Sequence, residues 1–504
     1  MGAMENDMDS SVRAERPYEG NDRLLFGIIM GVVAFWLFAQ TTLNIAPDMS
    51  RDLGMDASMM NVAVAITSLF SGIFIVVVGG LADRIGRLKI TRIGFYLSIA
   101  GSLLVAITPQ GWLAAPVLLV GRALQGLSAA CIMPASLALV KAYWDGPERQ
   151  RAISMWSIGS WGGSGLCSLV GGLMSQNFGW RSIFWVAALV SALGLWMIRG
   201  APESKAETTG EYRFDMPGVL AFMVTMVALQ VLVTQGNKLG WTSLIGLGLL
   251  AVTVLFGWLF VRIEDKASNA FFDFSLFRNA TYTGATISNF LINGTAGTLI
   301  VSLQLVQIGG NMNAQQAGFL TLGYAVAIIA FIRVGEKLLQ RFGPRKPMIW
   351  GCLITGLAIL MVSPANLLLS EYKILASAGY TLFGVGLAFY ATPSTDAALS
   401  NLPAAQTGSG SGIYKMASSL GAAFGVAISA AIFTALSGNS ASVNWLDGMI
   451  TFVGRQDNLA VREAAIVALS FNVLMVVMAI ISIMLTVPSG TRVKTGSAEL
   501  QIKR

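Results

Sequence analysis

Histidine is absent from the 504 residues, cysteine occurs three times, and charged side chains make up only 12% of the chain. The missing histidine removes the side chain that ordinarily titrates near neutral pH, so a proton carrier is expected to be Asp or Glu. Cys131, Cys167 and Cys352 fall in apolar segments and do not form a disulfide framework. No cluster of nucleophile, base or metal ligands is visible, which argues against an enzyme and against a metal site. No G-x-x-x-x-G-K-[ST] loop occurs either, which excludes an ATP-driven pump.

Hydrophobic residues instead make up 55% of the chain, and the mean hydropathy of +0.67 far exceeds what a soluble core requires. Apolar runs long enough to cross about 30 Å of hydrocarbon at about 1.5 Å per residue begin near Leu24, Met59, Ile90, Trp112, Arg151, Trp180, Met216, Trp241, Tyr282, Ala314, Pro347, Leu375, Ser409 and Glu463. We therefore predict an all-α polytopic membrane protein with about fourteen transmembrane helices.

The basic residues predict which way the chain is threaded. An even number of spans returns both termini to one side, and placing them in the cytoplasm puts most of the 33 Lys and Arg inside. The net charge of +7 then belongs to loops beside anionic lipid, and no basic stripe with interleaved aromatics indicates nucleic-acid binding. We expect a monomeric multi-pass protein of the bacterial cytoplasmic membrane, in contact with the lipid bilayer and with both termini cytoplasmic.

A charged loop between two apolar segments, residues 79–89 (GGLADRIGRLK), is repeated at residues 336–346 (EKLLQRFGPRK). Three residues lie 257 positions after their counterparts: Arg341, Gly343 and Lys346 after Arg84, Gly86 and Lys89. In helices 4 and 12 the offset is 258 to 259: Gly121, Gly126 and Pro134 recur as Gly379, Gly384 and Pro393. The repeat predicts two copies of a six-helix bundle.

This repeat divides the chain into five parts. We expect a cytoplasmic N-terminal tail (1–23), a six-helix bundle (24–200), a linker with two extra transmembrane helices (201–280), a second six-helix bundle (281–488) and a cytoplasmic C-terminal tail (489–504). The two extra helices have no counterpart in the repeat and are predicted to be an insertion. Two parallel six-helix repeats with a pathway at their interface are similar to the major facilitator fold.

The first charged loop resembles the G-x-L-A-D-R-x-G-R motif of the major facilitator superfamily, with Gly79, Asp83, Arg84, Gly86 and Arg87 in the matching positions. Asp83 lies at a helix end where it can pair with Arg84, Arg87 or a facing helix. Such a contact would close the cytoplasmic side and would break when the two halves rock. The alternative is a static, solvated loop.

The echo of that loop departs from the motif. Gln340 stands where Asp83 would be, so the second latch is predicted to be weaker or differently made.

Helix 4 contains GRALQGLSAA, starting at Gly121, which resembles the R-x-x-Q-G motif of drug:proton antiporters through Arg122, Gln125 and Gly126. An arginine about ten residues into a membrane helix is costly to bury and usually faces the bundle interior or a cavity. Arg122 is therefore a functional candidate. The alternative is a structural donor to helix 1 carbonyls or to Gln40.

Helix 5 resembles the antiporter motif of that helix through Gly163, Gly171 and Gly172, whose small size permits close helix contact. Cys167 and Ser168 stand where the motif has Gly-Pro, which leaves the proline-dependent kink in doubt. The glycines serve either small-residue packing alone or the direction of transport as well.

Longer strings extend the resemblance over nearly the whole chain: AFWLFAQ from Ala34, WSIGSWGG from Trp156, RVGEKLL from Arg333, YATPSTD from Tyr390 and GIYKMASS from Gly412. Together they resemble quinolone-efflux members of the fourteen-helix drug:proton antiporter family, within the major facilitator superfamily. The resemblance implies alternating-access export of fluoroquinolones and other amphipathic drugs, often cationic, such as quaternary ammonium and dye compounds. It also implies proton coupling and no cofactor. One departure is the missing acidic residue near Ala39, which many members have in helix 1.

Asp396 is the first candidate for the coupling carboxylate, because it follows Pro393 within a run otherwise free of charge. Lys415 is its predicted partner, since the two residues are equidistant from the middle of the 400–410 connection and would share a depth in an antiparallel hairpin. A lysine neighbour would oppose the effect of burial on the carboxyl pKa. The pair is therefore either a fixed ion pair or the coupling site.

Glu336 and Asp48 are the other carboxylate candidates. Glu336 has Arg333 three residues before it, a spacing typical of an intrahelical ion pair. Asp48 ends helix 1 on the outer side, where a solvated cap is the simpler interpretation. The substrate cavity is predicted from aromatic and amide side chains: Phe35, Gln40, Asn289, Asn293 and Tyr390.

Two other functions remain open from the residues alone. A major facilitator importer or exporter of a narrower solute shares the fold and the first charged loop, although the helix 4 and helix 5 motifs argue against it. A non-transporting membrane sensor would bind ligand without moving it.

Overall fold

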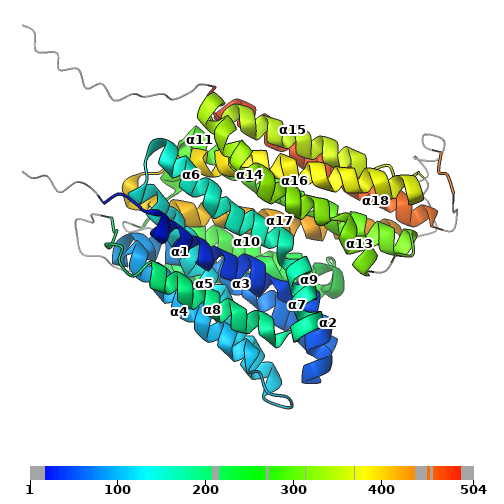
Figure 1. The fold of residues 1–504 in the computed structure, drawn as a ribbon, viewed down its shortest axis with the longest axis horizontal. Helices are drawn as coiled ribbons and strands as arrows, with labels where there is room; N and C mark the ends of the chain where they lie inside the picture. The colour runs from blue at the N-terminus through cyan, green and yellow to red at the C-terminus, as the bar shows by residue number, and fades with distance from the viewer. Residues whose placement is uncertain are drawn as a thin grey trace, which may run out of the picture.

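The computed structural model describes residues 18–206, 215–267, 272–312, 314–367, 369–437, 451–454 and 458–489 (Figure 1). Every regular element in those ranges is a helix, which confirms the predicted all-α class. Most of the two predicted tails, at 1–17 and 490–504, lies outside the described residues.

The first group of helices, α1 to α8, covers Asp22 to Met197. It consists of α1 (Asp22–Val33), the π-helical turn η1 (Ala34–Phe38), the 3-10 turn η2 (Ala39–Thr41), α2 (Thr42–Leu53), α3 (Ala57–Ile85), α4 (Arg87–Ala106), α5 (Ala114–Tyr143), α6 (Gly146–Ser157), the π-helical turn η3 (Ile158–Gly162), α7 (Gly163–Phe178) and α8 (Arg181–Met197). The elements α1, η1, η2 and α2 follow one another without a gap, as do α6, η3 and α7, so each set forms one long rod.

A middle pair, α9 (Met216–Leu239) and α10 (Leu244–Glu264), follows and packs side by side. The second group then runs through η4 (Phe274–Arg278), α11 (Ala280–Gly294), α12 (Gly297–Gln304), η5 (Leu305–Gly309), α13 (Ala314–Leu320), α14 (Leu322–Phe342), α15 (Arg345–Val362), α16 (Leu369–Ser400), η6 (Ala404–Gln406), α17 (Thr407–Ser437) and α18 (Leu459–Thr486).

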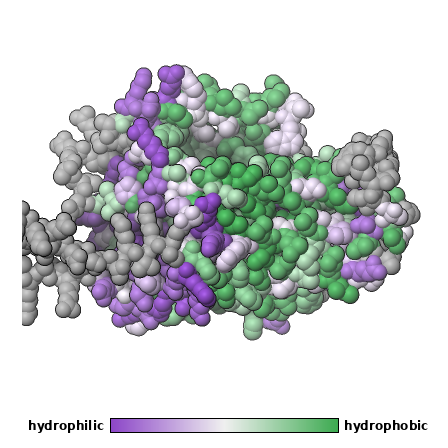
Figure 2. All heavy atoms as spheres, turned by 90° about the horizontal axis from the view of Figure 1, so that it is seen from above, coloured by the Kyte–Doolittle hydropathy of each residue, from purple (hydrophilic) through white to green (hydrophobic). Residues whose placement is uncertain are grey.

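The described helices are long and apolar enough for 12 membrane spans, or up to 13 if a bent pair counts as one. The expectation of about fourteen exceeds this, because the rod from Gly146 to Phe178 is interrupted and polar at its start, and α8 has only 17 residues. Both nevertheless pack lengthwise on neighbouring spans. Figure 2 shows an apolar band across the middle of the molecule, with hydrophilic side chains gathered mainly at one end.

Both described ends of the chain lie at that hydrophilic end, because α1 starts there and α18 finishes there (Figure 1). We call it the tail end. The turn between α3 and α4 lies there too, and it contains a single residue, Gly86, with φ of 133°. A side chain is strained in that conformation, and a Cβ would also lie 2.6 Å from the Glu203 carboxyl carbon. The motif glycine is therefore required by the turn itself.

The internal repeat is visible in pairs of helix contacts. A Cβ on Gly126 would lie 2.3 Å from the Thr67 carbonyl oxygen, and one on Gly384 would lie 2.5 Å from that of Tyr324. Tyr324 follows Thr67 by 257 positions, the offset of the charged loops. The same helix crossing thus occurs in both groups, at backbone separations that only glycine allows.

Candidate functional site

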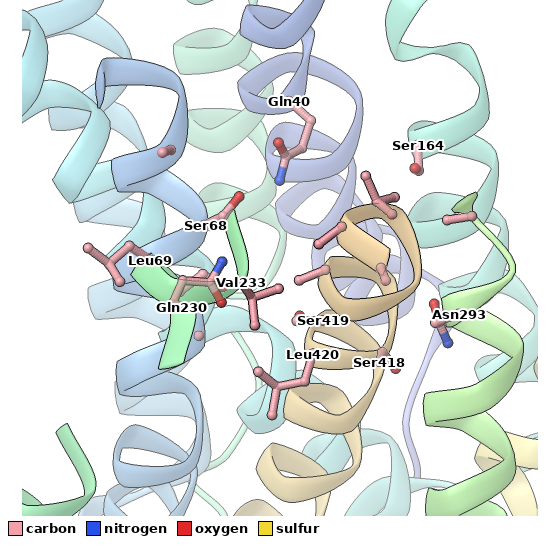
Figure 3. A pocket seen from close by; sticks show the side chains of 18 of the residues that line it. Gln40, Ser68, Leu69, Ser164, Gln230, Val233, Asn293, Ser418, Ser419 and Leu420 are labelled. Atoms are coloured by element: carbon pink, nitrogen blue, oxygen red, sulfur yellow. The ribbon is translucent and has the colours of Figure 1, made fainter. Parts of the chain in front are cut away.

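A cavity of about 1050 Å³ lies between the two groups of helices and is the large concave site of the described chain. Aromatic rings form much of its wall: Phe35, Trp36, Trp161, Tyr324 and Phe383. Amide and hydroxyl groups enter it from different helices, and Figure 3 shows Gln40, Ser164, Gln230, Asn293 and Ser419 around the opening. Such a mixture of apolar surface and a few polar groups suits drug-sized amphipathic molecules.

Three of the five predicted cavity residues line this space: Phe35, Gln40 and Asn293. Asn289 and Tyr390 do not, and their prediction was wrong. Asn289 donates to the Tyr414 carbonyl oxygen at 3.0 Å, and the Tyr390 hydroxyl is 2.7 Å from that of Ser288. Both side chains make contacts between helices. The prediction failed because the residue type does not reveal which face of a helix a side chain occupies.

Charge is nearly absent from the cavity wall. Among the described lining residues, Lys415 is the one member of the Asp, Glu, Lys and Arg group. Lys415 is 7% exposed, and its Nζ lies 4.3 Å from the centre of the Trp156 ring. It makes no ion pair with a described carboxylate. The predicted pair of Asp396 with Lys415 is therefore wrong.

Asp396 instead pairs with Arg149 of α6, at 3.4 Å between Oδ1 and Nε. Gln150 and Ser400 also donate to its carboxylate, at 3.5 and 3.4 Å. The error lay in depth along the helices. Asp396 is four residues from the end of α16, whereas Lys415 is eight residues from the start of α17, so Lys415 is deeper by about 6 Å.

Asp83 is held at the start of α17. Its carboxylate accepts hydrogen bonds from the backbone N–H groups of Gly408 at 2.8 Å and Ser409 at 3.0 Å, and from Arg87 Nη2 at 2.8 Å. The first N–H groups of a helix have no partner within it and carry a partial positive charge, so a carboxylate is stabilised there. The prediction that Asp83 pairs with Arg87 or a facing helix is confirmed on both counts.

Three further contacts join the two groups of helices at the tail end. Arg87 Nη2 donates to the Ala404 carbonyl oxygen at 2.6 Å, and Lys141 donates to that of Leu402. Arg149 Nη2 donates to the Ser400 hydroxyl at 2.9 Å. We call these contacts, together with those of Asp83 and Asp396, the tail-end seal.

Gly79 allows the seal to close. A Cβ on Gly79 would lie 2.5 Å from the Gly408 carbonyl oxygen, so α3 and α17 cross there at backbone contact. Arg84, by contrast, belongs to the loop but not to the contacts described for the seal. The cavity reaches from Lys415 and Ile75 toward Val62 and Ala430, away from the tail end. The chain is therefore closed at the tail end, and its cavity lies on the other side of the seal.

The segment between α10 and α11 is tied to the same seal. Gln406 Nε2 donates to Asp273 Oδ2 at 2.6 Å, two residues from Ala404. Burial opposes ionisation of Asp273, but hydrogen bonds from Ser275 and Gln406 outweigh it and hold the pKa of this carboxyl below its usual range. The middle pair is thus linked to the loop that precedes α17.

Arg122 is fully buried and lies outside the cavity wall. Its Nη1 donates to the Ala39 carbonyl oxygen at 2.8 Å and to Gln125 Oε1 at 2.7 Å, and its Nε donates to the Ala63 carbonyl oxygen at 3.1 Å. Ala39 stands where the π-helical turn of the first rod gives way to a 3-10 turn. The contacts agree with the structural alternative, a donor to helix 1, and Gln40 is not a partner.

The other antiporter-motif residues pack helices together. Gln125 Nε2 donates to the Ser102 hydroxyl at 3.2 Å. A Cβ on Gly163 would lie 3.2 Å from Trp36 Cβ, and one on Gly171 would lie 2.9 Å from Thr41 Cβ, so both positions would be crowded. A Cβ on Gly172 would have no atom within 4 Å, so of these two adjacent glycines only Gly171 has a packing role.

Glu336 and Asp48 remain outside the cavity as well. Glu336 pairs with Arg333 and accepts from Gln340 Nε2 at 3.3 Å, which confirms the intrahelical pair. That contact stays within α14, so the second loop makes no counterpart of the Asp83 contact among the described residues. Asp48 pairs with the exposed Arg51 and accepts from the Ser175 hydroxyl at 2.9 Å.

Several site residues were not predicted from the sequence. No motif in the sequence distinguishes Arg149 from the other basic residues, and Trp36 and Trp161 project from π-helical turns that no sequence pattern indicates. Gln230 of α9 lines the cavity because α9 packs against both α3 and α17. Its signal was an amide in an apolar span, a type of residue that is seldom placed against lipid.

A family model described as Major Facilitator Superfamily matches residues 25–426 and 282–489. The chain is 46% identical over 446 residues to the quinolone resistance protein NorB of Staphylococcus aureus strain MRSA252, which covers 86% of this chain and 95% of that protein. NorB of strain MSSA476 is 47% identical over 420 residues, covering 83% and 90%.

Two solved structures have the same fold. The proton:xylose symporter XylE matches with a TM-score of 0.62 at 15% identity, over 93% of this chain and 96% of that one. A bacterial homologue of the iron transporter ferroportin, in an outward-facing state, matches with a TM-score of 0.59 at 11% identity, over 92% and 98%.

Proposed function

The chain belongs to the major facilitator superfamily, and we propose on that basis that it is a proton-coupled multidrug efflux antiporter of the bacterial cytoplasmic membrane. It exports amphipathic drugs, fluoroquinolones among them, as its similarity to quinolone resistance proteins suggests. Quaternary ammonium and dye compounds are the other candidate substrates. It acts as a monomer with cytoplasmic termini, needs no cofactor, and draws its energy from the proton gradient.

One observation carries this proposal: a drug-sized cavity between two repeated groups of helices, sealed at one end by contacts that join those groups. A transporter that alternates its access needs a site at the interface and a set of contacts that can break on one side at a time. The positive-inside rule supports a cytoplasmic position for the tail end. This conformation then faces outward, ready to release drug.

Alternation follows from rocking of the bundles at 24–200 and 281–488 about the cavity. Opening the tail end separates Asp83 from the start of α17 and Arg149 from Asp396, and closes the opposite side. The described contacts of the seal include ionic and hydrogen-bonded pairs, and their free energy can be offset by contacts formed on the other side. Gly79 allows the seal to re-form at backbone distance.

Proton coupling is assigned to the seal through Asp396. Protonation removes its charge and with it the ion pair to Arg149, which favours the open tail end. Drug and proton then favour different conformations, and each lowers the affinity of the other, as antiport requires.

The test is uptake of norfloxacin and ethidium into inverted vesicles under an imposed proton gradient, with the intact protein and Asp396→Asn at matched expression. We expect gradient-driven uptake by the intact protein. Asp396→Asn should lose most of the gradient-driven part and keep drug binding, because asparagine cannot cycle a proton.

Undiminished uptake by Asp396→Asn would contradict its role in coupling and leave it as a partner of Arg149. Uptake of neither drug by the intact protein would contradict multidrug efflux itself. A narrower solute, or a sensor that moves nothing, would then account for the fold.

A further inference from the structure

Lys415 lies at the inner limit of the cavity, on the side nearest the seal. It is 93% buried, since only 7% of its surface is exposed. Within the described chain its ammonium group has neither a hydrogen-bond acceptor nor a carboxylate partner. An ammonium has three donors and is costly to bury without partners for them. The cavity therefore has, on the side of the seal, one basic group that no described side chain pairs with, and a bound carboxylate would stabilise its protonated form.

The surroundings of Lys415 hold it in place without satisfying it. Its Nζ faces the ring of Trp156, and the ring of Tyr414 lies 5.7 Å away. Trp156 is fully buried and is oriented by the hydrogen bond from its Nε1 to the Ser136 hydroxyl at 2.9 Å. Aromatic faces stabilise a cation but accept no strong hydrogen bond, so the donors remain available to a ligand.

Asp396, Asp83 and Arg122, which are also buried, are engaged by other partners. Asp396 is held by Arg149, Asp83 by Arg87 and the start of α17, and Arg122 by backbone carbonyls. No acidic side chain occurs among the described lining residues. A cavity with one cation and no anion attracts a negative group and repels a second cation.

The rest of the wall completes a site for a planar aromatic acid. Trp36, Trp161 and Phe383 offer apolar faces. The amides of Gln40 and Asn293, labelled in Figure 3, offer neutral hydrogen-bonding groups. We propose that Lys415 binds the carboxylate of amphipathic aromatic acids and zwitterions, and that the cavity prefers such drugs to permanent cations without an acidic group. This inference rests on the proposed export of drugs through the cavity.

The experiment measures binding to the purified protein in lipid nanodiscs by calorimetry near neutral pH, with no proton gradient. The three probes are norfloxacin, its methyl ester, which lacks the carboxylate, and ethidium, a permanent cation. The intact protein should bind norfloxacin about tenfold or more tightly than the ester.

The variants isolate the charge of Lys415. In Lys415→Met, norfloxacin should bind about tenfold or more weakly. The ester, still a cation through its piperazine ammonium, and ethidium should both bind as well or better, because a repelling cation is gone. Lys415→Arg should keep most of the preference for norfloxacin. Ser419→Ala, on the same helix and also lining the cavity, is the matched control and should change all three affinities equally.

Equal weakening of norfloxacin and ester by Lys415→Met would overturn the proposal and leave Lys415 with a packing role. If that variant does not fold, equal affinity of the intact protein for norfloxacin and ester would overturn it as well. If the protein binds norfloxacin more tightly than its ester but shows no gradient-driven transport, the result contradicts only the proposed export. Transport of all three probes without discrimination would contradict this inference alone.

Discussion

Four buried ionisable side chains of this bundle, Asp83, Arg122, Asp396 and Lys415, differ in what they contact. Asp83 is bound by a helix start and an arginine, Arg122 by backbone carbonyls and an amide, and Asp396 by an arginine from the opposite group of helices. Lys415 alone faces only aromatic rings. Removing one partner of a buried charged contact leaves the other uncompensated, so such substitutions separate structural roles from transport roles.

The first prediction concerns Asp83→Asn. Asparagine keeps one acceptor oxygen but loses the charge that the α17 N–H groups and Arg87 stabilise, so the seal should weaken by about 2 kcal/mol. The closed state would lose roughly thirtyfold in population relative to the open one. The measurement is the rate at which an impermeant maleimide labels a cysteine at Ser71, in the cavity wall, from the tail end.

Faster labelling in Asp83→Asn than in the otherwise intact protein is the expected result. The control is Asp48→Asn, an exposed carboxylate paired with Arg51 away from the seal, which should leave the labelling rate unchanged. Equal rates in Asp83→Asn and the intact protein would mean that the seal does not depend on this charge.

The second prediction separates the two interpretations of Arg122. In Arg122→Lys one ammonium replaces a guanidinium that reaches Ala39, Ala63 and Gln125 together, so at least one carbonyl loses its donor. Unfolding in detergent should be easier by about 2 kcal/mol, and transport per folded molecule should be retained. Thermal melting and vesicle uptake check this. Unchanged melting with lost transport would instead assign Arg122 to the transport cycle.

Among the elements, two interrupted rods form the aromatic wall of the cavity. The π-helical turns Ala34–Phe38 and Ile158–Gly162 carry Trp36 and Trp161, which both line it. A π-helical turn adds a residue to one turn and rotates the side chains that follow, and such turns are frequent at functional sites. The α9 helix adds Gln230 by packing between α3 and α17, so the middle pair contributes to the cavity wall.

The third prediction uses the repeat of glycine crossings. Gly126→Ala and Gly384→Ala each place a Cβ within 2.5 Å of a facing carbonyl oxygen, so the helices must separate. Both variants should be destabilised by about 1–3 kcal/mol. Gly172→Ala, where nothing lies within 4 Å, is the control and should melt like the intact protein. Melting temperatures in detergent decide the outcome. Unequal damage at Gly126 and Gly384 would mean that the two crossings are not equivalent.

At the scale of the whole molecule, the contacts of the seal join segments more than 240 residues apart in sequence, such as Arg149 and Ser400. The two groups of helices meet there, and the cavity lies between them on the far side. Transport by rocking therefore requires that these contacts break and re-form in every cycle.

The fourth prediction locks the tail end. Arg149→Cys combined with Ser400→Cys, joined by a short dithiol-reactive cross-linker that replaces the length of the arginine, should abolish drug uptake. Cleavage of the linker should restore it. The matched control is Lys89→Cys with Glu203→Cys, an exposed pair within the first group of helices, where the same linker should leave uptake unchanged. Transport that persists with the Arg149–Ser400 positions joined would contradict the rocking of the two groups.

The amino-acid sequence by itself determined the all-α membrane class, the repeat and the position of Asp83 at a helix end, because hydropathy, period and helix-end motifs are local properties of the chain. Only the tertiary structure decided what each buried side chain faces. Asp396 and Lys415 lie on facing helices of a hairpin, yet the point at which α17 starts separates them in depth. The side chains of Asn289 and Tyr390 point into contacts between helices, whereas that of Gln230 points into the cavity. Depth and rotation of a helix are set by packing against distant segments, which no local pattern records.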